Sequence, residues 1–187
     1  MGWTILVVLT VLGLAVAYVI AVYNRLVASR QRVAEAWSGI DVQLKRRADL
    51  VPNLVATVQG YAGHERGLLE EVTRQRARIA ETPAGDIEGR ARAEGQMGAM
   101  IGRVLAVAEA YPDLKASANF RELQASLEAL ERDIQHARRY HNGAVRMLNT
   151  QVQSFPSNLV ARRFAFTEAR YFEPESPQDR ALPQVAF

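Results

Sequence analysis

An uncharged, apolar run at the start of the chain limits the folds open to it. No Asp, Glu, Lys or Arg occurs before Arg25, and only two threonines and one glycine interrupt residues 3–23. As an α-helix, with a rise of about 1.5 Å per residue, this run is roughly as long as the hydrocarbon core of a bilayer is thick, about 30 Å. Trp3 lies near one end of the run, and Tyr18 and Tyr23 lie toward the other, as aromatic residues do at membrane interfaces. The run therefore predicts a single-pass transmembrane anchor over residues 1–24.

A cleaved signal peptide is the alternative interpretation of this run. Ala15-Val16-Ala17 has the small-x-small form that signal peptidase accepts. However, no Lys or Arg precedes the apolar run, and the run continues for several residues past Ala17. We therefore favour an uncleaved anchor.

The charges beside the anchor predict its orientation. Arg25, Arg30 and Arg32 follow it closely, whereas nothing basic precedes it. The positive-inside rule then places the N-terminus outside and the rest of the chain in the cytoplasm. We expect the protein to reside in the bacterial inner (cytoplasmic) membrane.

Composition indicates one water-soluble domain after the anchor, expected over residues 25–173, with residues 174–187 as a flexible, Pro-rich tail. The chain has no cysteine, which excludes disulfides, thiolate metal ligands and a cysteine nucleophile. The net charge is +3, and charges of both signs are interspersed. Nucleic acid is therefore not an expected partner.

Apolar residues at spacings of three and four predict an all-α fold, an elongated bundle of about four long antiparallel helices. The helices are expected near residues 24–60, 61–81, 87–110 and 120–152. No Gly or Pro separates the anchor from the first of them, so the two should form one helix. Pro52 removes a backbone hydrogen bond within that helix, so we expect a bend near Ala48.

The segment from residue 120 shows the most regular apolar seam, typical of a coiled-coil-like bundle helix. Asn119 followed by Glu122 predicts a capping box at its start, and Pro156 should end it. The seam consists of Phe120, Leu123, Leu127, Leu130, Ile134, Ala137, His141, Ala144, Leu148 and Val152.

No constellation in the sequence favours catalysis. His64-Glu65 begins like the zinc-protease motif His-Glu-x-x-His, but position 68 is Leu. His136 and His141 are five residues apart, which places them on different faces of a helix. Phosphate-binding loops, nucleophile elbows and paired-carboxylate sites are not found either. We expect a non-enzymatic protein that uses no cofactor and no metal.

The basic block at residues 45–47 has three possible roles. Successive cations on a helix point in different directions, so a solvated face with salt bridges from Lys45 to Asp41 or Asp49 is the simplest. The second possibility is that the block, which includes Arg46 and Arg47, forms a binding surface for an acidic partner. The third possibility is a buried network of Arg and Asp that fixes helix register beside Pro52.

Aromatic residues gather after the last predicted helix, at Phe155, Phe164, Phe166, Tyr171 and Phe172. Their rings either fold back and close the end of the bundle, or form an exposed patch for a neighbouring subunit or a protease.

Four stretches, residues 23–27, 36–55, 60–65 and 155–159, resemble the LemA family of bacterial membrane proteins, and the Arg-Arg-x-Asp-Leu-x-Pro-Asn block at residues 46–53 is the most specific. The resemblance extends to residues 171–173. It implies an N-terminal anchor, an extracytoplasmic N-terminus and a bundle of long helices. These stretches and the clusters above contain the candidate structural or interaction residues, which are Trp37, Arg46, Arg47, Asp49, Pro52, Asn53, Phe155, Pro156, Asn158, Tyr171 and Phe172.

The resemblance implies no reaction. Members of the family are often encoded beside membrane proteases of the heat-shock type, which points to envelope quality control, and a related branch serves in magnetosome membranes. Two residues depart from the family pattern. His141 stands where a second tyrosine usually follows Tyr140, and Leu148 replaces the tyrosine of a later Tyr-Asn pair.

Two functions remain open. The first is a membrane-anchored scaffold or adaptor that forms homo-oligomers and binds a membrane protease or another membrane protein. The second is a sensor in which the continuous first helix couples the state of the bilayer to the bundle.

Overall fold

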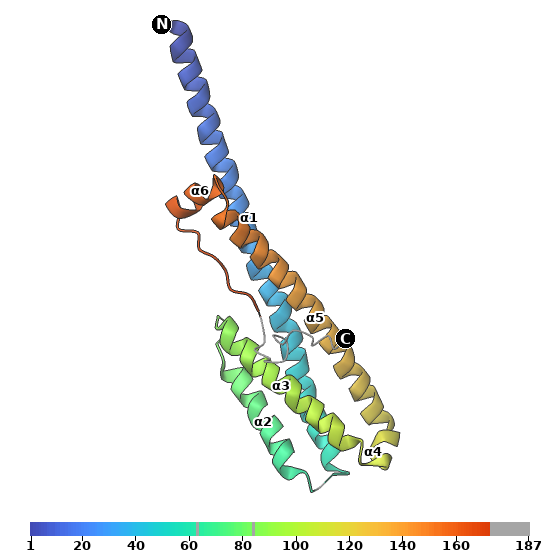
Figure 1. The fold of residues 1–187 in the computed structure, drawn as a ribbon. Coiled ribbons are helices and arrows are strands. Elements are labelled where there is room, and N and C mark those ends of the chain that lie inside the picture. The colour runs from blue at the N-terminus through green and yellow to red at the C-terminus, as the bar shows by residue number, and fades with distance from the viewer. Residues whose placement is uncertain (63, 84, 173–187) are drawn as a thin grey trace, which may run out of the picture. The chain divides into compact units, whose positions relative to one another are not determined.

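The structure, a computed structural model, describes residues 1–62, 64–83 and 85–172. These residues contain six α-helices and no strand, in the order shown in Figure 1. The predicted all-α fold is confirmed, whereas the predicted tail at residues 174–187 lies outside the described residues. The helices are α1 (Gly2–Gln59), α2 (Arg66–Glu81), α3 (Ile87–Ala108), α4 (Pro112–Ala116), α5 (Ala118–Gln153) and α6 (Ser157–Arg163).

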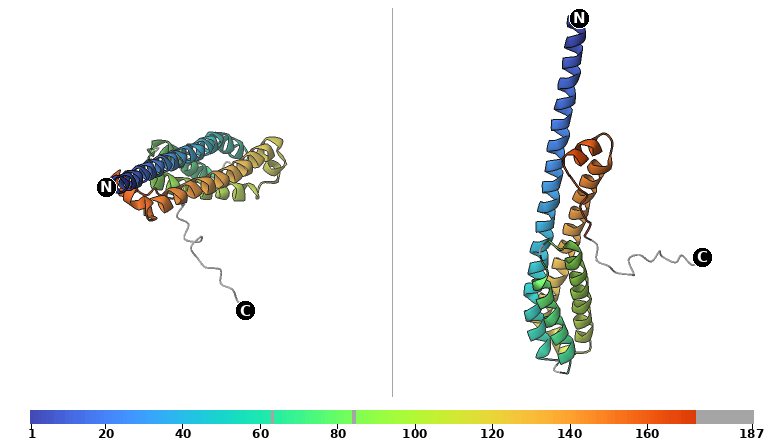
Figure 2. Two further views of the ribbon diagram at one scale, coloured as in Figure 1. Left: turned by 90° about the horizontal axis from the view of Figure 1, so that it is seen from above. Right: turned by 90° about the vertical axis from the view of Figure 1, so that its left-hand side faces the viewer.

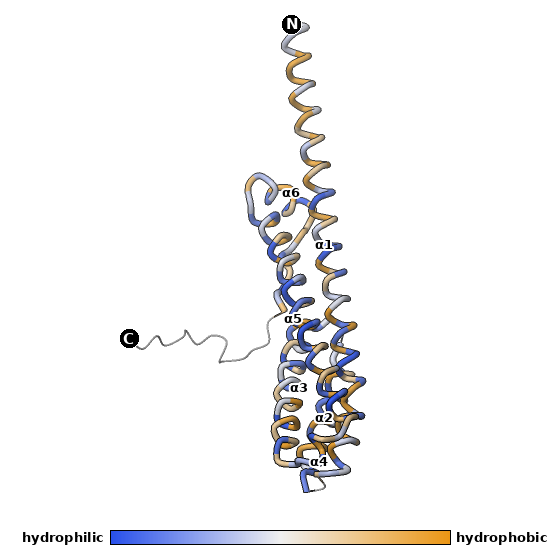
Figure 3. The backbone as a smooth tube through the Cα atoms, turned by 90° about the vertical axis from the view of Figure 1, so that its right-hand side faces the viewer, coloured by the Kyte–Doolittle hydropathy of each residue, from blue (hydrophilic) through white to orange (hydrophobic). Residues whose placement is uncertain are grey.

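Helix α1 continues without a break from the apolar run into the amphipathic segment, as predicted. It is the one helix in the described residues that is long and apolar enough to cross a membrane. Its N-terminal part is apolar in Figure 3, and side chains such as Leu6 and Leu14 are more than 60% exposed. Thr4 and Thr10 donate hydrogen bonds to the carbonyls of Met1 and Leu6, at 2.7 and 2.9 Å. The two hydroxyls are therefore compatible with an apolar surrounding.

The described chain forms two compact units, to which α1 and α5 both contribute. Unit 1 comprises residues 1–38 and 139–171, and unit 2 comprises residues 39–138 with Phe172. The predicted boundary between anchor and bundle at residue 24 lies inside unit 1.

Unit 1 packs the first part of α1 against the end of α5 and against α6, and both views in Figure 2 show α6 beside α1. Spacings of three and four on α1 and α5 place one apolar stripe of each helix in the shared core. This core consists of Leu26, Val33, Ala36, Ala144, Val145, Leu148, Val160, Ala161 and Phe166.

Unit 2 is a bundle of the last part of α1, the α2–α3 hairpin, α4 and the first part of α5. The predicted seam of α5 is buried here, from Phe120 to Ile134. Asp86 caps α3 by accepting a hydrogen bond from the Gly89 N–H at 2.9 Å, which satisfies a free donor of the first turn. Other core residues include Val51, Leu54, Val58, Val72, Met97, Val104 and Leu114.

Two predicted helix starts are wrong. Helix α2 begins at Arg66 rather than near residue 61. Helix α3 ends at Ala108, close to the predicted residue 110, and Pro112 occupies the first turn of the short helix α4, which was not predicted. Helix α5 begins at Ala118, and the Ser117 carbonyl accepts from the Arg121 N–H at 3.2 Å, so Asn119 lies inside the helix and forms no capping box.

Helix α1 continues through Pro52, which leaves the Ala48 carbonyl without its usual helical donor. The Arg76 side chain of α2 supplies one, because its Nε lies 2.9 Å from that carbonyl oxygen. A long-range hydrogen bond within unit 2 therefore compensates for the proline.

Candidate functional site

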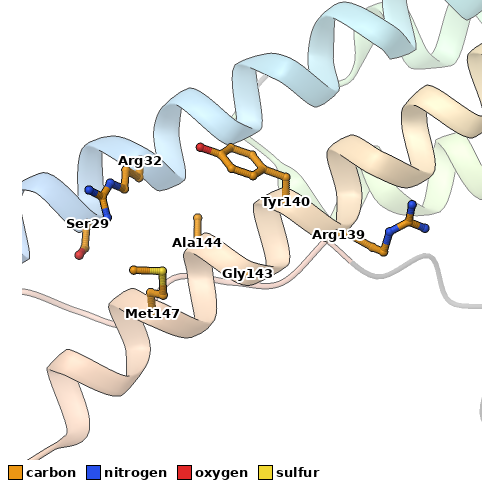
Figure 4. Close-up of a pocket in the computed structure, with 7 residues that line it drawn as sticks. All are labelled: Ser29, Arg32, Arg139, Tyr140, Gly143, Ala144 and Met147. Atoms are coloured by element: carbon orange, nitrogen blue, oxygen red, sulfur yellow. The ribbon is translucent and has the colours of Figure 1, made fainter.

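An open groove of about 410 Å³ lies between α1 and α5 within unit 1. In Figure 4 the Tyr140 ring extends from α5 toward α1, and the Arg139 side chain lies at the opposite end of the group from Ser29. The groove is lined by Ser29, Arg32, Arg139, Tyr140, Gly143, Ala144 and Met147.

Helical spacing explains how α5 forms its side of the groove. Tyr140, Gly143, Ala144 and Met147 follow the i, i+3, i+4, i+7 pattern, so they share one face. Apart from its chain neighbours and the backbone of its own helix, no heavy atom lies within 4 Å of the position that a Cβ on Gly143 would occupy, which leaves the groove open there. Tyr140 is 60% exposed and Met147 is 49% exposed, whereas Ala144 between them is buried.

Ser29 and Arg32 form the α1 side and are one helical turn apart. The buried Ser29 hydroxyl donates to Gln151 Oε1 at 3.1 Å, which connects α1 to α5 beside the groove. The groove thus offers guanidinium groups, a phenol and a thioether. These groups suit binding. In the sequence, Arg32 was named only as a charge beside the anchor and Tyr140 only as part of the family pattern, and neither was predicted to bind a partner.

His141 lies next to the groove residue Tyr140 and is fully buried. Its ring packs edge-on against Trp37, with 5.8 Å between ring centroids, and its Nδ1 lies 3.3 Å from Asn142 Oδ1. Burial lowers the pKa of His141 below its usual value, and the contact with Asn142 opposes this only in part. Trp37, one of the candidate interaction residues, therefore packs on His141, the residue that stands where the family usually has a tyrosine.

The C-terminal segment of unit 1 is fixed to α5 by Asn149. This buried amide donates from Nδ2 to the Ala169 carbonyl at 2.9 Å and accepts from the Ala169 N–H at 2.8 Å. The sequence analysis missed Asn149, although it noted the Tyr-Asn pair that ends with this residue.

The aromatic residues after α5 divide between the two predicted alternatives. Phe166 is buried, and Phe164 is 46% exposed, yet both rings pack edge-on against Tyr23, with centroids 5.6 and 4.9 Å away. Phe155 is 78% exposed. Phe172, in unit 2, is fully buried with the Arg138 guanidinium 5.5 Å from its ring centroid.

The basic block splits in the same way. Arg46 is exposed, whereas Arg47 is buried in unit 2 and forms ion pairs with Glu94 of α3 and with Glu131 of α5, the latter at 3.1 Å. Burial raises the pKa of Glu94 above its usual value, although the nearby Arg47 opposes the shift. Arg47 is thus part of a buried ion-pair network, but its partners are glutamates of other helices rather than the predicted Asp, and Asp49 is exposed.

Asp41 also pairs across this region. It lies 2.7 Å from Lys45, as the i, i+4 spacing predicts, and 2.6 Å from Arg90 of α3. Two arginine and carboxylate pairs thus join α1 to α3 within unit 2.

The remaining candidates lie mostly at the surface. Pro52, Asn53 and Pro156 are exposed, and Asn158 is half-buried. Tyr171 is 39% exposed. The three aromatic residues assigned to the anchor are between 37% and 85% exposed; these are Trp3, Tyr18 and Tyr23.

His64 and His136 are exposed. Within residues 1–62, 64–83 and 85–172, no group of three His, Asp or Glu side chains is placed to hold a metal ion.

Comparison with known proteins identifies the family. A model of the LemA family matches residues 36–187. Magnetosome protein MamQ 1 of Paramagnetospirillum magneticum is 24% identical over 208 aligned positions, which cover 96% of this chain and 76% of the relative. Magnetosome protein MamQ of Magnetospirillum gryphiswaldense is 22% identical, with 87% and 70% covered. Protein LemA of Metamycoplasma hominis is 23% identical, with 80% and 68% covered.

The match to the family model covers most of the chain, including the Arg-Arg-x-Asp-Leu-x-Pro-Asn block and the groove residues of α5. Together with the all-α fold and the apolar start of α1, it indicates a membrane-associated helical protein. This chain belongs to the LemA family.

Proposed function

We propose that this protein is a non-enzymatic, membrane-anchored scaffold or adaptor that self-associates through unit 1. The groove between α1 and α5 is the observation that carries the proposal, because Arg, Tyr and Met are enriched at protein interfaces. Its α1 side, at Ser29 and Arg32, belongs to the same helix as the apolar run. A partner held in the groove would therefore stay close to the bilayer.

A second copy of this chain is the first partner in this proposal, and a membrane protease or another membrane protein is the next. The arginines that follow the anchor support a cytoplasmic location for the helices, with the N-terminus outside an inner membrane. Two relatives are named magnetosome proteins, which supports a role at a membrane. A function in envelope stress or membrane protein quality control belongs to the same proposal.

A photo-crosslinking amino acid at position 147 tests the groove in native membranes. We expect a product of twice the chain mass from position 147 and none from position 153, which is exposed near the end of the same helix. Replacing Tyr140 by Ser should reduce the product by about tenfold, as expected for an interface residue that contributes roughly 1.4 kcal/mol. Equal products from positions 147 and 153 would show that the groove is not the interface.

A sensor is the second candidate, favoured by the unbroken course of α1 from the apolar run into unit 2. A Gly-Pro insertion after Asn24 interrupts that helix and separates the two functions. A scaffold should still form crosslinked dimers after the insertion. A sensor should lose the response of unit 2 to bilayer composition, measured by hydrogen exchange of α2 and α3.

A further inference from the structure

The turn between α5 and α6 places apolar side chains beside the end of the apolar run. Phe164, the residue that follows α6, packs edge-on against Tyr23, with 4.9 Å between ring centroids. Tyr23 is the last residue of the run, and Arg25 is the first charge after it. Contact with Tyr23 therefore puts the end of α6 level with the point at which the helix leaves the hydrocarbon, and Figure 1 shows α6 beside α1 there.

Three large apolar side chains in the turn, in α6 and directly after α6 are exposed. Phe155 is 78% exposed, Leu159 is 59% exposed and Phe164 is 46% exposed. Two other residues of α6, Val160 and Ala161, are buried in the core of unit 1. The helix is thus held by one face, while Leu159 remains outside the core. We call Phe155, Leu159 and Phe164 the interfacial patch.

Cations accompany the interfacial patch in the sequence, and the acidic residues nearest to it along the chain segments of unit 1 are Glu35 and Glu168. Arg162 and Arg163 end α6, and both are exposed. Residues 154–167 contain no Asp or Glu, and neither do residues 1–34, which include Arg25, Arg30 and Arg32. Apolar side chains next to unopposed arginines are typical of segments that lie in a membrane interface and contact anionic headgroups.

We propose that the interfacial patch inserts into the bilayer surface and that Arg162 and Arg163 bind the headgroups of anionic phospholipids. This second lipid contact rests on the proposed anchor, but it does not depend on self-association. The patch would hold unit 1 against the membrane, so the α5–α6 turn and the start of α1 would attach it at two places. A second copy of the chain is the competing occupant of the patch.

Single-cysteine labelling of the full chain tests the proposal, since the sequence has no cysteine of its own. Leu159→Cys reports on the interfacial patch and Leu12→Cys on the anchor. Ser38→Cys is the water-exposed control, because Ser38 is exposed and lies about 22 Å farther along α1 than Tyr23. Each variant carries the small fluorophore NBD and is placed in nanodiscs of phosphatidylcholine with or without phosphatidylglycerol. Quenching is then measured with lipids that carry a nitroxide near the headgroup or deep in the acyl chain.

The label at position 159 should be quenched at least twofold more by the shallow nitroxide than by the deep one. The label at position 12 should show the opposite preference, and the label at position 38 should show little quenching by either. In discs with phosphatidylglycerol, Arg162→Gln with Arg163→Gln should reduce shallow quenching at position 159 to the level seen in phosphatidylcholine alone. The matched variant, Arg162→Lys with Arg163→Lys, should retain it.

If position 159 is quenched no more than position 38 while position 12 is quenched by the deep nitroxide, the patch does not bind lipid although the anchor spans the bilayer. If position 12 is not quenched, the anchor is wrong, and the patch proposal is overturned with it. In discs that hold more than one copy, the label at position 159 could instead be protected from aqueous iodide without being quenched by either lipid nitroxide. That result would assign the patch to a second copy and would also overturn the proposal.

Discussion

At the residue scale, the buried charges of unit 2 and the buried imidazole of unit 1 have the clearest energetic consequences. Arg47 and Glu94 lie in the core, where an ionised group needs its partner to offset desolvation. The sequence shows three successive cations at residues 45–47 but not which of them is buried. That depends on Glu94, 47 positions away on α3, and no local pattern contains this information.

Replacing Arg47 by Met should lower the free energy of unfolding by about 3–5 kcal/mol, because Glu94 would remain buried without its partner. Adding Glu94→Met should recover much of the loss. Chemical denaturation of the full chain in detergent, followed by circular dichroism, measures both effects. Arg46→Met is the matched control and should change little, since Arg46 is exposed. Equal effects of Arg46→Met and Arg47→Met would contradict the assigned network.

The buried His141 should make stability depend on pH. Its pKa is lowered in the folded state, so between that pKa and the unfolded value of about 6.5 the unfolded chain binds more protons. The contribution of His141 to the free energy of unfolding should therefore be highest above pH 6.5 and should fall as the pH decreases below it. Glu94, whose pKa is raised by burial, contributes with the opposite sign, because the folded chain binds more protons between the unfolded value of Glu94 and its raised pKa.

His141→Gln isolates the histidine contribution, because both proteins share every other titrating group. We expect the difference in unfolding free energy between wild type and variant to change between pH 7.5 and pH 5.5, by about 1.4 kcal/mol for each unit of the pKa shift. Trp37 fluorescence in a Trp3→Phe background reports the same ring contact. If the difference in unfolding free energy between wild type and variant stayed constant with pH, the pKa of His141 would be the same in the folded and unfolded chain.

At the element scale, the long helices with a regular apolar period could be predicted from the sequence. Short helices, and features that depend on contacts between distant residues, could not. The α5 seam and the continuity of α1 follow from apolar spacing and from the lack of a helix breaker. Helix α6 has seven residues, too few to show a period, and the start of α5 depends on α4 immediately before it. The groove was missed because Tyr140 and Met147 are exposed and lie outside the apolar seam.

The hydrogen bond that compensates for Pro52 can be tested by a double-mutant cycle. Arg76→Met removes the donor to the Ala48 carbonyl and should cost about 1 kcal/mol. In a Pro52→Ala background the new backbone N–H can donate to that carbonyl, so the same substitution should cost clearly less. Arg74→Met, on the exposed surface of the same helix, is the control. Additive effects of Pro52→Ala and Arg76→Met would show that the two residues are not coupled.

At the scale of the whole molecule, the protein combines an apolar start of α1, a groove in unit 1 and membership of the LemA family. The groove uses residue types found at protein interfaces, and the helix that forms one of its sides begins with the apolar run. Self-association at a membrane is therefore the central claim.

The most direct test is the number of copies in discs of native membrane excised by a polymer, measured by native mass spectrometry at physiological expression. The account predicts discs that contain two or more copies, and it predicts that Tyr140→Ser with Met147→Ser shifts them to one copy. Thr150→Ala with Gln153→Ala, which changes exposed residues near the end of the same helix, should leave the copy number unchanged. Discs with one copy of the wild-type chain would contradict the account.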